Sequence, residues 1–466
     1  MTVTLLGWII IPLGLAMIVV KPEWVYAATV FFLPFSATAV INLGSDSSSA
    51  SGVQVWLYLA TLLLLRWAVI SLFRLEIQIN NTIRRLSLYL SVFVAICAIS
   101  LLMPLWINGH LQVMSPYLLD FTTTPLVFTS KNITGFLYIL IGFCFALFVA
   151  NKNADPHNFR RSSYLFLLSC VFVAAWGLFQ LSLNVLHLPY PAMIFNNSAT
   201  PSAAGYTETL AMSEITRLTS VAVEPSMLVQ TLLLGLTFTL PALLGNGYIL
   251  GLQKDRIAAT MLIFTCLAAT SSTGYIGLTL LLLLVCWIMY KSGRLRARIV
   301  IGLVCGAIAV IGAYFTVSVF HTIATNTLLN KGTSFSALER AKTIYYAFQY
   351  FLDYPVLGVG WASVTSHDLV VKILSNTGIV GFTAFSVFVG LLLANMLRTS
   401  RRAVIAKRYF DQPSTILFIA CVEMLLLASI TEFPDVFGHF WFILGMGIAS
   451  TSERLNDVVF FVRKAA

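Results

Sequence analysis

The chain alternates long apolar runs with short polar breaks along its whole length. Each apolar run has roughly 17–25 residues, which as a helix is enough to cross about 30 Å of hydrocarbon. Because a backbone in lipid must satisfy its own polar groups, these runs predict membrane-spanning helices. We expect about 13 spans, with 12 as the lower count, near 4–20, 24–43, 53–72, 87–106, 134–150, 164–186, 225–243, 257–270, 274–290, 299–320, 378–396, 414–431 and 437–450.

Composition agrees with this pattern. Apolar residues make up 59% of the chain, charged residues only 10%, and the mean hydropathy is +0.89, which excludes an ordinary soluble domain. Residues 1–466 therefore predict one integral membrane domain of the all-α, polytopic class.

The basic residues give the expected orientation. The net charge is +10, and most lysines and arginines gather in alternate loops, near 21, 74–85, 152–161, 254–256, 291–298, 398–408 and 454–464. By the positive-inside rule these loops are cytoplasmic. Since the charge is spread over short turns, we expect no nucleic-acid partner. Most carboxylates fall on the outer side, so the outer cations Arg217 and Arg340 depart from the trend.

The outer segment 321–377 should have structure of its own. Residues 336–353 predict an amphipathic helix, with Leu338, Tyr345 and Phe348 among its apolar positions, and Pro355 should end it. A second short helix is expected from an N-cap at Ser366 to Asn376, with Asp368 in its first turn and Gly378 closing it.

His367 is the candidate general base. We place it in the first turn of the second helix, where the positive end of the helix dipole disfavours an imidazolium. A neutral imidazole at a membrane edge can accept a proton from a hydroxyl group. The alternative is a structural histidine that hydrogen-bonds the loop Gly358–Gly360.

Arg217 and Arg340 are the candidate diphosphate ligands. Both should lie near lipid headgroup level, where a guanidinium can bind phosphate oxygens through two hydrogen bonds. The alternatives are a snorkelling cation and a structural pair, such as Arg217 with Glu224.

Other polar groups have both structural and functional interpretations. Glu224-Pro225-Ser226 has the pattern of a helix start, and Ser271 and Ser272 either form a tight turn or offer hydroxyls to a sugar. Glu432 and Asp435 could bind a cation, but this is a weak metal signal, and we expect no metal and no cofactor. Glu423 lies inside a span and needs a partner, for which Arg66 is a candidate.

Taken together, residues 210–385 resemble the superfamily of O-antigen ligases and O-antigen polymerases, which are bacterial envelope glycosyltransferases. Two positions depart from the family pattern: Asp368 stands where Asn is frequent, and Ser-Ser stands where the turn often carries Ser-Arg. The resemblance is carried by Arg217 before a span, the turn Ser271-Ser272-Thr273-Gly274, Arg340 on a large outer loop, Pro355 with Gly358-x-Gly360, and His367-Asp368-Leu369 before Gly378-x-x-Gly381.

The resemblance implies a C-type glycosyltransferase fold in the bacterial inner membrane, with a metal-independent active site that faces the periplasm. The implied donor is an oligosaccharide on undecaprenyl diphosphate. His367 would deprotonate the acceptor hydroxyl, while Arg340 and Arg217 would stabilise the diphosphate leaving group. The further substrate-binding candidates are Glu224, Ser271, Ser272, Gly358, Gly360 and Asp368.

Three functions are compatible with these features. Arg217 followed by Glu224-Pro225-Ser226 favours a polymerase of O-antigen or exopolysaccharide. An O-antigen ligase would use the same donor but transfer the glycan to lipid A core. A flippase of lipid-linked sugars would instead need charged residues in a central cavity. Membrane lipid and the lipid-linked glycan are the expected partners, and a chain-length regulator is a further candidate.

Overall fold

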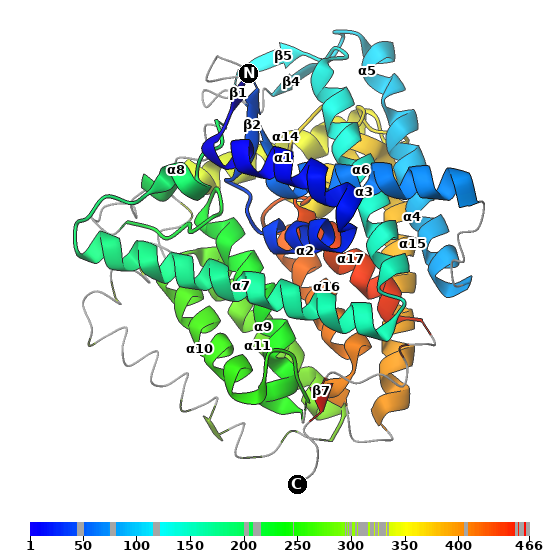
Figure 1. Ribbon diagram of the computed structural model, residues 1–466. Helices are drawn as coiled ribbons and strands as arrows, with labels where there is room; N and C mark the ends of the chain where they lie inside the picture. The colour runs from blue at the N-terminus through cyan, green and yellow to red at the C-terminus, as the bar shows by residue number, and fades with distance from the viewer. Residues whose placement is uncertain are drawn as a thin grey trace.

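The computed structural model describes residues 1–43, 51–74, 81–114, 122–199, 205–207, 216–245, 247–293, 335–404 and 409–452, with single positions at 295, 297, 301–302, 305, 316, 321, 325, 332, 455 and 461–462. Within these residues, seven helices are long and apolar enough to cross a membrane, and three shorter helices are equally apolar. The predicted class, an all-α polytopic membrane protein, is therefore confirmed (Figure 1).

The helices follow the apolar runs of the sequence closely. In the first half of the chain they are α1 (Leu5–Val20), α2 (Pro22–Phe32), α3 (Val55–Arg74), α4 (Asn81–Ser100), α5 (Leu102–Ile107), α6 (Ser130–Lys152), α7 (Pro156–Val185) and α8 (Ala192–Phe195). In the second half they are α9 (Pro225–Leu244), α10 (Leu252–Ala268), α11 (Ser272–Lys291), α14 (Phe335–Asp353), α15 (Leu369–Val404), α16 (Pro413–Ala428) and α17 (Gly438–Ser450), with a short 3-10 turn η4 (Tyr409–Asp411).

The predicted span at 24–43 is wrong. Helix α2 ends at Phe32, residues 33–38 form turns, and strand β2 (Ala39–Leu43) ends the range. Pro34 follows the helix end and cannot donate the next helical hydrogen bond, while the β-branched residues after it favour an extended chain. The predicted span at 299–320 lies almost entirely outside the described residues.

Short strands connect the helix ends. Strand β2 is the centre of an antiparallel sheet with β1 (Thr2–Val3) and β3 (Ser51–Gln54), and Thr2 pairs with Asn42. Two further antiparallel pairs join β4 (Gln112–Met114) to β5 (Thr123–Pro125) and β6 (Gly247–Tyr248) to β7 (Phe461–Val462), which is distant in sequence.

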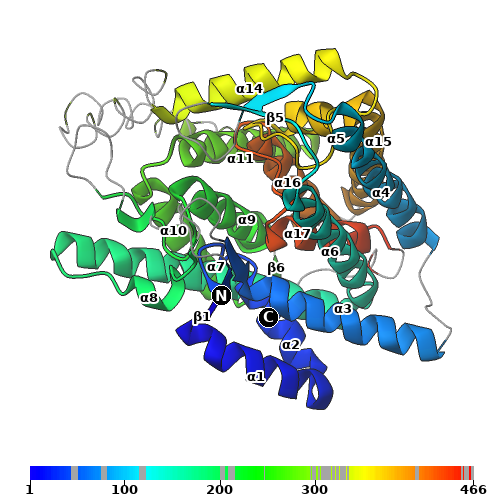
Figure 2. The ribbon, with the colours of Figure 1, turned by 90° about the horizontal axis from the view of Figure 1, so that it is seen from above.

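The core lies around α9, α16 and α17. Every residue of α17 is buried, and 83% of the apolar window of α9 is buried as well. Helices α1 and α3 lie at the periphery, where Trp8 and Phe73 are 70% and 84% exposed (Figure 2). Exposed apolar side chains on peripheral helices are what a lipid environment requires.

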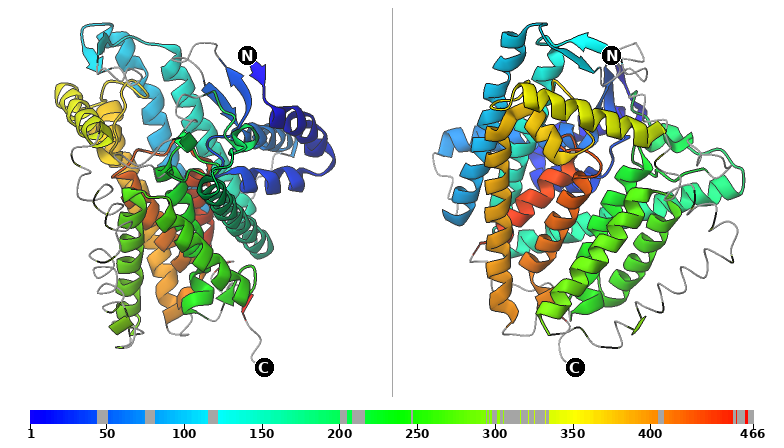
Figure 3. Two further views of the ribbon diagram at one scale, coloured as in Figure 1. Left: turned by 90° about the vertical axis from the view of Figure 1, so that its left-hand side faces the viewer. Right: turned by 180° about the vertical axis from the view of Figure 1, so that it is seen from behind.

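Helix α14 lies across the end of the bundle, roughly perpendicular to α15 (Figure 3). The predicted amphipathic helix is confirmed, and Pro355 follows its end at Asp353. Its apolar stripe faces outward: Leu338, Tyr345 and Leu352 are half or more exposed. The buried stripe contains Thr343, Ala347 and Tyr350 instead. A helix with its apolar side outward is suited to the membrane interface.

A break at Gly378 divides α15 into two helices. Gly378 has φ 65° and ψ −169°, while Gly358, in the loop that packs against it, has φ 65°. A Cβ at Gly378 would overlap the Val356 carbonyl oxygen, and one at Gly358 would overlap the Ser375 carbonyl oxygen. The sequence-based prediction that a short helix closes at Gly378 is thereby confirmed.

We predict that Gly378→Ala destabilises the protein by about 2 kcal/mol, because alanine disfavours positive φ and its Cβ meets backbone. Gly390→Ala is the matched control, since it lies in the same helix and a Cβ there would contact nothing within 4 Å. Thermal unfolding in detergent measures both. Equal melting temperatures for the two variants would contradict the prediction.

Candidate active site

Four separate segments meet at His367, and three of them bring charged groups close to it. They are the end of the outer loop, which carries His367 itself, helix α14 with Arg340, the segment 429–437 with Glu432, and the start of α9 with Glu224. Arg340 lowers the pKa of His367, while Glu432 and Glu224 raise it, so all three groups lie within its electrostatic range. The structure therefore brings together the predicted base and one of the two predicted guanidinium groups.

The loop 354–368 is held rigidly under α14. The Trp361 side chain is 1% exposed, and the Trp361 backbone amide donates to Ser100 Oγ over 3.1 Å. Asn132 at the start of α6 donates to the Trp361 carbonyl oxygen over 2.9 Å. Asn376 donates from its side chain to the Val364 carbonyl oxygen over 3.1 Å. These contacts fix the backbone that leads into His367.

A hydrogen bond from α14 fixes the His367 ring. Thr343 Oγ1 lies 2.9 Å from His367 Nδ1 and also donates over 2.9 Å to the Arg340 carbonyl oxygen. Since a hydroxyl has one proton, Thr343 must accept the second bond from Nδ1–H. In the neutral ring this leaves Nε2 as the proton acceptor.

Burial lowers the pKa of His367 below its ordinary value of 6.5, and Arg340 lowers it further. The expectation that the ring is neutral near pH 7 thus has a firmer cause than the helix dipole. His367 lies just ahead of α15, which begins at Leu369, and not in its first turn. The cap is Asp368, whose Oδ1 accepts from the Val371 amide over 2.7 Å.

The predicted roles of Ser366 and Asp368 are corrected by this geometry. Ser366 was expected to be the N-cap, but it is buried and its Oγ has no hydrogen-bond partner among the described residues. Asp368 was expected in the first turn, and it caps the helix instead. Its place as a substrate ligand stays a prediction, as do those of Gly358 and Gly360, whose backbone packs against Ser375 and Pro104.

Arg340 is held at the edge of the site. Its Nη1 donates to the Ile430 carbonyl oxygen over 3.0 Å, which ties α14 to the segment 429–437. Arg340 and Thr343 are three residues apart and therefore lie on one side of the helix. One guanidinium edge is used by this bond, and the remaining donors can serve an anion.

A buried lysine, which the sequence did not single out, forms ion pairs with two carboxylates near His367. Lys372 on α15 is 7% exposed, and its Nζ lies 2.8 Å from Glu432 Oε1 and 3.5 Å from Asp435 Oδ1. Burial alone would raise the pKa of Glu432, but the adjacent Lys372 ammonium lowers it below its ordinary value. Burial raises the pKa of Asp435, which lies farther from the ammonium. The cation that these carboxylates bind is therefore Lys372.

The remaining predicted residues lie at or before the N-termini of α9 and α11. Glu224 precedes α9, whose first residue is Pro225, and accepts a hydrogen bond from Ser226 Oγ over 3.0 Å, so the predicted helix start is confirmed. Ser271 is the N-cap of α11 and Ser272 its first residue. Arg217 lies ahead of α9, and its charge is within electrostatic range of Tyr275 in the first turn of α11. Its convergence with His367 stays a prediction.

The partner proposed for Glu423 is not Arg66. Glu423 is fully buried, and neither carboxyl oxygen has a hydrogen-bond partner among the described residues. Its Oε1 faces Gly277 on α11. Arg66 lies on α3 and lines a separate pocket with residues of α2 and α6.

An apolar groove leads away from the site along α15 and α16. It has a volume of about 420 Å³ and begins at Leu369 and Ser429, beside His367 and Ile430. It continues past Phe385 to Leu393. An apolar groove of this kind can accept a hydrocarbon chain.

One comparison with known proteins found a match. Residues 257–386 match the family model described as O-antigen ligase, which supports the O-antigen ligase and polymerase superfamily and confirms the predicted resemblance. The match implies an enzyme of glycosyl transfer in a multi-pass membrane protein. The segment contains Ser271, Ser272, Arg340 and His367, whereas Arg217 and Glu224 precede it. No curated protein matches the chain significantly.

Sequence reasoning missed Thr343 and Lys372. A weak signal existed for Thr343, which follows Arg340 by three residues on a predicted helix. For Lys372 the signal was a lysine beside an apolar span, opposite a pair of outer carboxylates. Neither signal specifies a contact, because both partners come from segments distant in sequence.

We predict that Lys372→Met destabilises the protein by about 3 kcal/mol, because it leaves the Asp435 carboxylate buried without a counter-ion. This value is the lower end of the usual range, since the second carboxylate, Glu432, is 38% exposed and can be solvated. Lys372→Arg is the control, because it keeps the charge. Thermal unfolding of the purified variants measures the difference, and a melting temperature for Lys372→Met equal to that of wild type would contradict the role of the ion pairs.

We predict that His367 stays neutral at pH 7, with its proton on Nδ1. Because its pKa is lowered, the ring becomes charged only when the pH falls below 6.5, and base activity is retained above that pH. Nitrogen NMR of ¹⁵N-histidine-labelled protein measures the tautomer and the titration. Thr343→Val should shift the population toward the Nε2–H tautomer, and Thr343→Ser should not. A ring that is protonated at pH 7 would refute the assignment.

Proposed function

We propose that this protein is a periplasm-facing glycosyltransferase that uses an undecaprenyl-diphosphate-linked oligosaccharide as its donor, and that it polymerises O-antigen or exopolysaccharide. The observation that carries the proposal is the hydrogen bond between Thr343 Oγ1 and His367 Nδ1, which leaves Nε2 available as a proton acceptor, with the Arg340 guanidinium within electrostatic range of the ring. The match to the O-antigen ligase family supports glycosyl transfer as the reaction.

The proposed reaction is a single displacement. His367 Nε2 accepts the proton of an acceptor hydroxyl, whose oxygen attacks the anomeric carbon of the donor sugar. The bond from that carbon to the diphosphate oxygen breaks, and undecaprenyl diphosphate leaves with the electron pair. Arg340, with Arg217 as the second proposed ligand, stabilises the negative charge that develops on the diphosphate.

The groove supports a lipid-linked donor. It starts beside His367 and runs between α15 and α16, so an isoprenoid chain lying in it would place its diphosphate near Arg340. The exposed apolar stripe of α14 at the end of the bundle provides a surface at which such a lipid can enter. Glu224, Ser271 and Ser272 are proposed to bind the sugars.

Polymerase and ligase differ only in the acceptor. The segment from Arg217 to Ser226 favours a polymerase, in which the acceptor is another lipid-linked repeat. The description of the matched family favours the second candidate, an O-antigen ligase that transfers glycan to lipid A core. The alternative to an enzymatic function is transport of lipid-linked sugars.

We predict that His367→Ala and Arg340→Ala each lower glycan transfer by about 100-fold or more, as expected for loss of a general base or of charge stabilisation. The assay uses purified protein in detergent with a defined undecaprenyl-diphosphate oligosaccharide, without a membrane gradient. His157→Ala is the control, because it removes an exposed histidine at the start of α7.

The products of the same experiment separate the candidate functions. Longer lipid-linked chains indicate a polymerase, whereas transfer that requires lipid A core indicates a ligase. Wild-type transfer by folded His367→Ala and Arg340→Ala variants would overturn the proposed mechanism. Absence of any product from wild-type protein, with gradient-dependent translocation in vesicles, would favour transport.

A further inference from the structure

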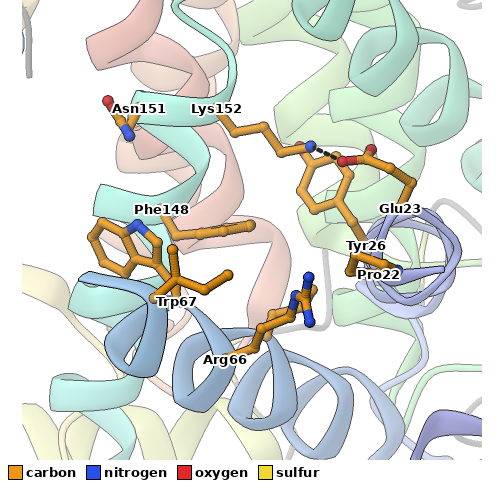
Figure 4. A pocket seen from close by; sticks show the side chains of 10 residues that line it. Pro22, Glu23, Tyr26, Arg66, Trp67, Phe148, Asn151 and Lys152 are labelled. Atoms are coloured by element: carbon orange, nitrogen blue, oxygen red, sulfur yellow. Dashed lines mark hydrogen bonds and ion pairs between the residues drawn. The ribbon is translucent and has the colours of Figure 1, made fainter. Parts of the chain in front are cut away.

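A second polar pocket lies far from the active site, between α2, α3 and α6. It has a volume of about 230 Å³ and is lined by the side chains drawn in Figure 4. Three kinds of group form it: the ion pair of Glu23 and Lys152, the guanidinium of Arg66, and the aromatic rings of Tyr26, Trp67 and Phe148. The proposed glycosyl transfer uses none of these residues.

The length of helix α6 gives the distance between this pocket and the loop that leads into His367. Asn132, in its first turn, is bonded to Trp361 in the outer loop, and Lys152 is its last residue. Twenty residues of helix span roughly 30 Å, the thickness of a bilayer core. Lys152 and Arg161 belong to the predicted basic loop at 152–161, so by the positive-inside rule we assign the pocket to the side of the basic loops.

The pocket has an excess of positive charge. Glu23 Oε1 lies 2.6 Å from Lys152 Nζ, and Glu23 Oε2 lies 3.2 Å from Arg161 Nη1. One carboxylate thus already meets two cations. Arg66 adds a third and has no hydrogen bond or ion pair with the described residues. Its side chain rises from α3 toward Tyr26 and the Glu23–Lys152 pair (Figure 4).

The walls of the pocket are fixed by hydrogen bonds. Tyr26 Oη lies 2.7 Å from Ser162 Oγ and accepts from the Asn153 side chain over 3.0 Å. Lys152 Nζ lies 4.9 Å from the centre of the Tyr26 ring, in a cation–π contact. The position of the ammonium is therefore set before any ligand binds.

The surroundings of the pocket are apolar and exposed. Leu65 and Val69, on either side of Arg66 along α3, are 60% and 52% exposed, and Trp24 on α2 is 61% exposed. In a membrane these side chains contact lipid chains, and an exposed tryptophan is typical of the headgroup level. A cation between such residues meets the phosphate groups of lipids before it meets bulk solution.

We propose that this pocket binds the headgroup phosphate of an anionic phospholipid from the leaflet on the basic side. Arg66 offers a paired donor edge to the phosphate oxygens, and Lys152 contributes a second positive charge. The acyl chains would lie along Leu65 and Val69. A volume of about 230 Å³ holds several groups of the size of a water molecule, about 30 Å³ each in the liquid, so a phosphate with part of its glycerol fits.

The test measures lipid binding by the full-length protein and does not depend on its enzymatic activity. Purified protein in detergent is titrated with dioctanoyl phosphatidylglycerol, with dioctanoyl phosphatidylcholine and with inorganic phosphate, and binding is followed by thermal shift and native mass spectrometry. We expect phosphatidylglycerol to bind at least about tenfold more tightly than phosphatidylcholine, and Arg66→Gln to reduce that affinity by about tenfold.

Lys254→Gln is the matched control, because it removes an exposed cation from the same side, on α10, and should leave binding unchanged. Arg66→Lys should retain part of the affinity, which shows that charge and not packing is responsible. Equal binding of both lipids, or full binding by folded Arg66→Gln, would overturn the proposal. Stabilisation by inorganic phosphate equal to that by phosphatidylglycerol would also overturn it, since the site would then bind a free anion.

Discussion

The architecture of the site depends on one buried ion network. Lys372 places a positive charge inside the first turn of α15, and Glu432 and Asp435 neutralise it from the segment between α16 and α17. An unpaired charge in this position would cost several kcal/mol, so the two segments cannot separate without a large penalty. Because Arg340 bonds to Ile430 in the same segment, α14 is positioned through this network as well. His367 lies at the junction of all three.

The end of the bundle that carries α14 combines irregular backbone with long apolar helices. Lipid tolerates no unsatisfied backbone groups, and loop 354–368 accordingly lies at the end of the bundle, where Ser100, Asn132 and Asn376 satisfy its polar groups. Rigid support of this kind suits the proposed role of His367, since the orientation of its ring determines which nitrogen can accept a proton. Thr343 supplies that orientation from a different element. The site is therefore an assembly of helix ends and not a property of one motif.

The two polar sites of the protein differ in their balance of charge. At the end that carries α14, carboxylates outnumber cations around His367. At the opposite end, cations outnumber carboxylates around the pocket of Arg66 and Lys152. The same asymmetry that orients the chain during insertion thus also separates a proposed catalytic site from a proposed lipid site.

The sequence alone determined the class, most helix positions and the order of the polar segments, because hydropathy, prolines and glycines act locally. Pro225 begins a helix, Pro355 follows the end of one, and Gly378 breaks one, as the local rules predict. Pro34 likewise indicated a helix end within 24–43, but the high hydropathy of that range led to the wrong prediction of a span. Only the tertiary structure decided that the apolar stripe of α14 faces outward and that Thr343 and Lys372 complete the site. In lipid both the core and the outer surface are apolar, so periodicity reveals that a helix has two faces but not which of them the protein buries.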